Sequence, residues 1–180
     1  MLKSYFKLFA WWTLFVFLGT LIANLNMQEG WETVISELAT SALMGVALAA
    51  VLGTLNGRRC RAIAGGKGEG DIYSPDQVRK VKLALAQDRA FHLVSHYLRE
   101  VARYKVLGAD QVTATIDAST PSVMFRTMGS RITARVEKDG EGSLVTIHCR
   151  PAFPPYIVDF GTNLALALAM ENFLKAADRP

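Results

Sequence analysis

Residues 8–27 read LFAWWTLFVFLGTLIANLNM, and residues 38–55 read LATSALMGVALAAVLGTL. Neither segment contains a charged residue. A helix needs roughly 20 apolar residues to cross the hydrocarbon core of a bilayer, and about 17 at the short end of the range. The two segments therefore predict a transmembrane helical hairpin at the start of the chain.

The charges beside these segments predict the orientation of the hairpin. Basic residues lie only outside it, and the connecting loop is acidic. Short cytoplasmic flanks are enriched in Lys and Arg. We therefore expect two passes with both termini on the cytoplasmic side. The residues are Lys3, Lys7, Arg58, Arg59 and Arg61 in the flanks, and Glu29 and Glu32 in the loop.

A retained anchor has two alternatives. A cleaved signal peptide also begins with basic residues, but its apolar core spans only about 7–15 residues. The end of the first segment, residues 21–24 (LIAN), lacks a small-x-small cleavage site. Two long core helices of a soluble protein would each show a polar face, and neither segment has one. The sequence therefore favours the membrane anchor.

Small residues recur along the second segment. Ser41, Gly45, Ala49 and Gly53 stand four residues apart, so they share one face of a helix. Such a small-residue stripe lets another helix backbone approach closely. Two readings stay open: the stripe receives the first helix of the same hairpin, or it contacts another subunit.

Composition divides the 180-residue chain into three parts. We expect the hairpin over residues 1–56, a Gly-rich linker over 57–74 and one domain over 75–180. The linker is not a phosphate-binding loop, because no Ser or Thr follows Lys67. The net charge of +4 resides largely in the membrane flanks, so we expect no nucleic-acid partner. Cys60 and Cys149 are isolated and are interpreted as ordinary thiols.

Hydrophobic periodicity predicts an α+β domain. Alternating apolar residues indicate strands, and Asp88 can begin a helix whose apolar face runs from Phe91 to Val101. Short turns between successive strands favour a mainly antiparallel sheet with the helices on one face, in the order β-α-β-β-β-β-α. The expected strands cover residues 81–85, 104–107, 112–118, 132–136 and 145–149, with a short addition at 156–158, and the closing helix covers 163–177.

Several motifs in this domain resemble a known family. They are Thr120-Pro121 through Phe125 and Gly129, the strand pair that follows, Arg150-Pro151-Ala152, and Asp159-Phe160-Gly161-Thr162-Asn163 before the last helix. Together they resemble an uncharacterised, membrane-associated α+β domain family of bacteria. The resemblance implies a bacterial inner membrane as the location, and it implies no activity.

Candidate catalytic residues are few. His92, His96 and Glu100 are spaced so that one helical face could offer them to a metal. They lie opposite the apolar face, where a solvated polar stripe is expected, and the glutamate of a His-Glu-x-x-His motif is missing. No serine stands in a nucleophile motif. We therefore expect no catalytic residue, no metal site and no cofactor.

The DFGTN stretch, residues 159–163, is the strongest local signal in the domain. Gly161 can adopt a backbone conformation that other residues avoid, and Thr162 or Asn163 can cap the next helix. A structural turn accounts for these residue types. In the functional alternative, Asp159 contacts a ligand or a partner.

The long connection at residues 120–128 is the second candidate for recognition. Phe125 and Arg126 within it combine an aromatic ring with a cation, as anchor residues of interfaces do. Phe125, Arg126 and Asp159 are therefore the predicted partner-binding residues.

These observations favour a non-enzymatic membrane subunit or assembly scaffold, which docks through its hairpin and presents a protein-binding domain. The expected partners are the lipid bilayer and a membrane protein or a second copy of this chain. The alternative is a membrane-anchored sensor or carrier of a small apolar ligand or lipid, bound between sheet and helix. A metal-dependent hydrolase that uses His92, His96 and Glu100 is the third hypothesis.

Overall fold

The computed structural model describes residues 2–24, 31–65, 71–121, 129–152 and 159–179. The chain divides into two compact units, Met1–Arg59 and Cys60–Pro180. Phe125, Arg126 and the short strand expected at residues 156–158 lie outside the described residues.

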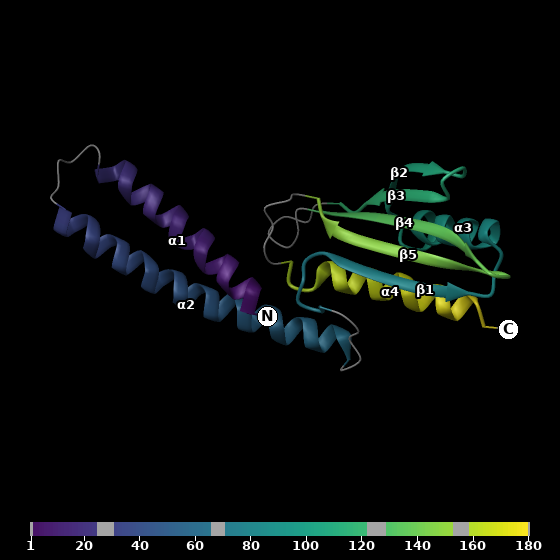
Figure 1. Cartoon of the computed structure of the whole chain (residues 1–180), viewed down its shortest axis with the longest axis horizontal. Coiled ribbons are helices and arrows are strands. Elements are labelled where there is room, and N and C mark those ends of the chain that lie inside the picture. The colour runs from purple at the N-terminus through teal and green to yellow at the C-terminus, as the bar shows by residue number, and fades with distance from the viewer. Residues whose placement is uncertain (1, 25–30, 66–70, 122–128, 153–158, 180) are drawn as a thin grey trace. The chain divides into compact units, whose positions relative to one another are not determined.

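The first unit is formed by α1 (Leu2–Asn24) and by α2 (Trp31–Ala64) as far as Arg59, and the last turn of α2 belongs to the second unit. The predicted helical N-terminus is therefore present (Figure 1). Because α2 continues to Ala64, residues 57–64 are helical, whereas the sequence placed them in a linker. Within the described chain, one helix is long and apolar enough to cross a membrane, Glu32–Ala64, and a shorter apolar stretch covers Phe9–Ile22.

The second unit is built on a five-stranded antiparallel sheet. The strand order across the sheet is β1-β5-β4-β3-β2, so the first strand pairs with the last one. The predicted α+β class and element order are confirmed. The strands are β1 (Gln77–Leu83), β2 (Lys105–Asp110), β3 (Thr115–Ser119), β4 (Ser130–Asp139) and β5 (Gly142–Pro151).

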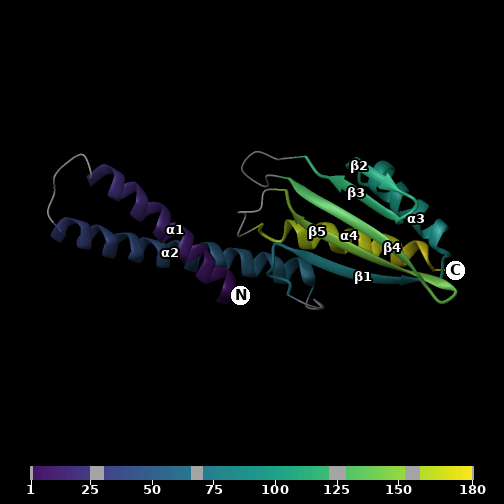
Figure 2. The same cartoon turned by 45° about the horizontal axis from the view of Figure 1, so that its top comes forward.

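Two helical segments cover one face of this sheet (Figures 1 and 2). The first is α3 (Gln87–His96), which runs into a π-helical turn, η1 (Tyr97–Val101), and contacts β3, β4 and β5. The second is α4 (Thr162–Ala177), which contacts β1 and β5. The inward-facing residues of both helices and of the strands form one apolar core.

Alternation of buried and exposed side chains explains why the central strands form. Along β4 and β5 every second residue is buried from Ile132 to Val136 and from Val145 to Cys149. A pleated strand sends successive side chains to opposite faces, so this pattern buries one face under α3 and α4. The other face of the sheet carries the more polar residues between them, including Thr146 and His148.

The turn between β2 and β3 differs from the prediction. The sequence alternation placed Val112 and Ala114 in a strand, but both precede β3 and Val112 is 95% exposed. The Asp110 carboxylate accepts hydrogen bonds from the backbone N–H of Val112 and Thr113, at 2.8 and 3.4 Å. Ala114 then adopts φ 48°, which no strand residue can have. A side-chain-capped turn therefore replaces the first three expected strand residues.

Candidate functional site

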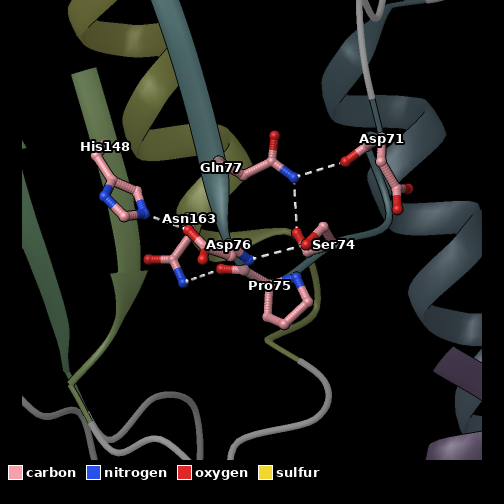
Figure 3. A network of polar contacts seen from close by, with 7 residues as sticks. All are labelled: Asp71, Ser74, Pro75, Asp76, Gln77, His148 and Asn163. Carbon is pink, nitrogen blue, oxygen red and sulfur yellow. Dashed lines mark hydrogen bonds and ion pairs between the residues drawn. The ribbon is translucent and has the colours of Figure 1, made fainter. Parts of the chain in front are cut away.

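Polar side chains gather where the chain enters β1 (Figure 3). Gln77 is buried, and its Nε2 donates to the carbonyl oxygens of Asp71 at 2.9 Å and Ser74 at 2.6 Å. Asp76 Oδ1 is hydrogen-bonded to His148 Nε2 of β5. Asn163 Nδ2 of α4 donates to the carbonyl oxygen of Pro75 at 2.7 Å. We call these seven residues the junction network: Asp71, Ser74, Pro75, Asp76, Gln77, His148 and Asn163.

Asp159 caps the first turn of α4. Its Oδ1 accepts the backbone N–H of Gly161 at 3.0 Å, and its Oδ2 accepts that of Asn163 at 2.7 Å. Gly161 has φ 73°, a conformation that favours glycine. The expectation that Thr162 or Asn163 would cap the helix was wrong, because the Thr162 hydroxyl instead donates to the carbonyl oxygen of Asp159 at 2.7 Å.

The Asp159 side chain lies inside the domain rather than on its surface. The residue is only 5% exposed, so it does not offer the accessible contact that the sequence suggested. Burial raises the pKa of its carboxyl group above the usual range, while the hydrogen bonds from Asn163 and Gly161 act in the opposite direction. Desolvation dominates because the group has left water almost completely. Asp159 is therefore a buried titratable group next to the junction network.

His148 and Cys149 are neighbours in sequence but cannot act together. Successive residues of β5 point to opposite faces of the sheet, so Cys149 faces the core while His148 faces Asp76 on the other side. Burial, with smaller effects of Asp159 and Asp76, raises the pKa of the Cys149 thiol to about 12. The thiol is thus protonated near neutral pH and is a poor nucleophile.

Phenol groups join Cys149 inside the domain. Tyr97 of η1 is 6% exposed, and its ring centroid lies 4.9 Å from that of Phe173 on α4. Burial, followed by the influence of Tyr104 and then of Cys149, raises the pKa of Tyr97 to about 12. Burial also raises the pKa of Tyr104, again with a contribution from Cys149. Two phenols and one thiol, all protonated near neutral pH, therefore lie in or against the core of the domain.

The histidines considered for a metal site do not converge. His92, His96 and Glu100 are all exposed; both histidines lie on α3, whereas Glu100 lies in the π-helical turn, which changes its alignment with them. The described part of the chain contains no group of three or more His, Cys, Asp or Glu side chains arranged to hold a metal ion.

The small-residue stripe lies inside the helical pair. Ser41, Gly45, Ala49 and Gly53 are all buried. A β-carbon added to Gly45 would meet α1 at Thr13, Phe9 and Trp12. Gly45 therefore faces α1 of the same chain, as one of the two readings of the sequence expects for the stripe. A contact of the stripe with another subunit stays a prediction.

Sequence reasoning missed the junction network because it followed apolar periodicity. Gln77 and Arg79 are inward-facing but polar, so the start of β1 gives no apolar alternation. The signal that could have located the network is local: Asp71 and the Ser74-Pro75-Asp76 sequence are typical of turns whose side chains bond nearby backbone. Both do so here, since Asp71 Oδ1 accepts the N–H of Tyr73 and Ser74 Oγ accepts that of Asp76.

No protein-family model and no curated protein matches the sequence. Several solved structures are similar over part of the chain. Ara h 8.0201 is 8% identical, with a TM-score of 0.43, over 57% of this chain and 94% of its own. Ginseng major latex-like protein 151 from Panax ginseng is 10% identical, with a TM-score of 0.42, over 60% and 99%. TTHA0849 from Thermus thermophilus is 14% identical, with a TM-score of 0.38, over 58% and 99%. At these scores the likeness assigns neither a family nor a function to the chain.

Proposed function

We propose that this chain is a membrane-anchored binding protein. In this proposal, α1 and α2 insert into a lipid bilayer, and the α+β domain holds a small, largely apolar ligand between the sheet and the helices. The role is binding rather than catalysis. The observation that carries the proposal is the distribution of side chains on the helical pair.

The helical pair is apolar on its outside and small or polar where its helices meet. Phe15 of α1 is 70% exposed and Leu43 of α2 is 72% exposed, whereas Ser41 is buried and Gly45 is buried against α1. Only 22% of the apolar window of α2 is buried, although a core helix of a soluble protein would be mostly covered. Exposed apolar surface of this extent is unfavourable in water and favourable among acyl chains. This distribution supports insertion in a membrane.

The flanking charges support the orientation. With Lys3, Lys7 and the arginines after Leu55 on one side, both termini are placed in the cytoplasm of a bacterial cell, and residues 25–30 face the periplasm. A cysteine introduced at Gln28 should react with a membrane-impermeant maleimide added outside spheroplasts, and one at Ser4 should not. Labelling at Ser4 alone would reverse the orientation.

The interior of the domain supports the ligand. Tyr97, Tyr104 and Cys149 offer O–H and S–H donors in or against the apolar core. These groups are protonated near neutral pH, so they suit a hydrogen-bond acceptor such as a carbonyl oxygen. A ligand with an apolar body and one such acceptor would satisfy both features.

Native mass spectrometry of the full chain, purified in mild detergent, tests the ligand. We expect a bound small molecule in the wild type and a smaller bound fraction in Tyr97→Phe, which loses one donor. Tyr73→Phe is the matched control, because Tyr73 lies in the segment before β1. Equal occupancy in the wild type, Tyr97→Phe and Tyr73→Phe would contradict the proposed place of the ligand.

A further inference from the structure

A separate hollow lies beside the start of α3, where this helix faces the turn between β2 and β3. Its volume is about 280 Å³. This is just below the range of roughly 300–1,000 Å³ that is typical of sites for drug-sized ligands. The hollow is lined by Gln87, Asp88, Phe91, His92, Gln111 and Ala114. We call it the α3 hollow.

Hydrogen bonds connect both walls of the α3 hollow to Val136 of β4. Gln87 Nε2 donates to the carbonyl oxygen of Val136 at 3.0 Å, which holds the first turn of α3. The backbone N–H of Val136 donates to the carbonyl oxygen of Ala114 at 2.9 Å, which holds the turn. The two sides are therefore positioned before any ligand arrives, and a preorganised site binds at a lower entropic cost.

The lining indicates the class of ligand. Asp88 supplies a carboxylate, Gln87 and Gln111 supply amide groups, and no Lys or Arg is among the lining residues. Asp110 begins the adjacent turn, and hydrogen bonds from Thr113 and Val112 lower the pKa of its carboxyl group, so it stays charged. The two carboxylates therefore attract positive charge, and Asp88 offsets the positive end of the α3 dipole.

The inner side of the α3 hollow is apolar. Phe91 is 6% exposed and Ala114 is 3% exposed, so both lie at the inner side of the hollow. Ala114 adopts φ 48°, where a residue with a β-carbon is strained and glycine is not. Glycine at this position would relieve the backbone strain, yet the chain carries a methyl group here. That methyl group forms part of the lining of the hollow.

We propose that the α3 hollow binds a small organic cation, with Asp88 as its anionic contact and Phe91 and Ala114 as its apolar wall. This inference rests on neither the membrane anchor nor the ligand proposed between sheet and helices. His92 also lines the hollow.

Benzylamine, benzyl alcohol and benzoate are suitable probes, because they share a ring and differ in charge. We would titrate each into the full chain in micelles and follow the ¹³C-labelled methyl resonance of Ala114. Benzylamine should shift this resonance and bind more tightly than benzyl alcohol, and benzoate should bind least. Equal affinity for all three probes, or no shift of the Ala114 resonance, would overturn the proposal.

Three variants sharpen this test. Asp88→Asn should weaken benzylamine binding about tenfold, because a charge-assisted contact is lost. Glu100→Gln, which removes an exposed carboxylate outside the hollow, should leave binding unchanged. Ala114→Gly, followed through the Phe91 ring resonances, should weaken binding while leaving the melting temperature unchanged or raised. Equal losses in Asp88→Asn and Glu100→Gln, or wild-type binding by Ala114→Gly, would contradict the assigned contacts.

Discussion

Gly45 of α2 lies so close to α1 that a β-carbon at this position would fall 2.7 Å from Thr13 Oγ1. A leucine here would overlap side chains of α1, and separating the helices to make room for it would remove the close packing that is their main attraction in lipid. Gly45→Leu should therefore lower the melting temperature of the helical pair in micelles, measured by circular dichroism.

Gly19 of α1 supplies the matched control for this change. A β-carbon there has no neighbour within 4 Å, so Gly19→Leu should leave the melting temperature nearly unchanged. Blue-native electrophoresis separates the two readings of the small-residue stripe. If Gly45→Leu abolishes an oligomer without altering the melting temperature, the stripe contacts another subunit rather than α1.

A second pair of glycines tests the β4–β5 hairpin. A β-carbon at Gly142 would overlap the carbonyl oxygen of Leu83 on the neighbouring strand β1. Gly142→Ala should lower the free energy of unfolding of the domain by about 1–3 kcal/mol, as overpacking does. Gly108→Ala, where a β-carbon meets nothing within 4 Å, should change it by no more than about 0.5 kcal/mol. Urea unfolding followed by circular dichroism measures both values, and equal losses would argue against the packing described for Gly142.

The raised pKa of Asp159 predicts how stability depends on acid. Burial raises the pKa of this group in the folded state. Its contribution to the stability of the fold is therefore complete below the unfolded pKa of about 4, and it is lost as pH rises through the folded pKa. Asp159→Asn keeps an oxygen acceptor but cannot ionise. Relative to the wild type, this variant should therefore gain stability as pH rises from acid to neutral. A stability difference that does not change with pH would show that Asp159 is not the group responsible.

The raised pKa of Tyr97 predicts how stability depends on pH in the alkaline range. Its pKa rises from 10.0 to about 12, so its contribution to stability is intact below 10 and is lost as pH rises through the higher value. Tyr97→Phe cannot ionise and should lose less stability than the wild type over this interval. Melting temperatures recorded by circular dichroism at pH 9 and at about pH 11 check the difference. Parallel losses in both proteins would assign the alkaline transition to other groups, such as Tyr104 or Cys149.

The sequence predicted best where apolar residues alternate without interruption. β4 and β5 follow from the period-2 pattern of Ile132 to Val136 and of Val145 to Cys149, and all three strand pairings involving them are antiparallel as expected. The order of elements followed from the short turns between these runs. In these strands the local pattern agrees with the burial in the folded domain, so periodicity alone was sufficient to predict them.

Prediction failed where polar side chains determine the backbone. At Val112 and Ala114 the apolar alternation suggests a strand, but the Asp110 carboxylate and the backbone of Ala114 form a turn instead. At Asp159 the type of residue suggested a surface contact, whereas two backbone N–H groups draw the carboxylate into the domain. In both places the competing hydrogen bonds depend on three-dimensional contacts that spacing in the sequence does not record.

The α3 hollow shows a further limit of sequence reading. Its lining comes from α3 and from the turn after β2, which lie more than one element apart in the chain. His92 was considered only with His96 and Glu100, because these residues share one helix. The structure instead groups His92 with Asp88 and Gln111. A site assembled from distant segments has no fixed spacing by which a sequence could reveal it.

Membrane partition of outward-facing lysine variants tests the central claim most directly. The full chain would be expressed in bacteria, and its membranes would be extracted with alkaline carbonate. We expect the wild type to stay in the pellet and Phe15→Lys/Leu43→Lys to be released, because a lysine among acyl chains costs about 2.5–3.5 kcal/mol at the bilayer centre. On a soluble helical pair the same substitutions at exposed positions would be harmless. Release of the wild-type chain by carbonate, or identical behaviour of the wild type and the lysine variant, would contradict the membrane anchor.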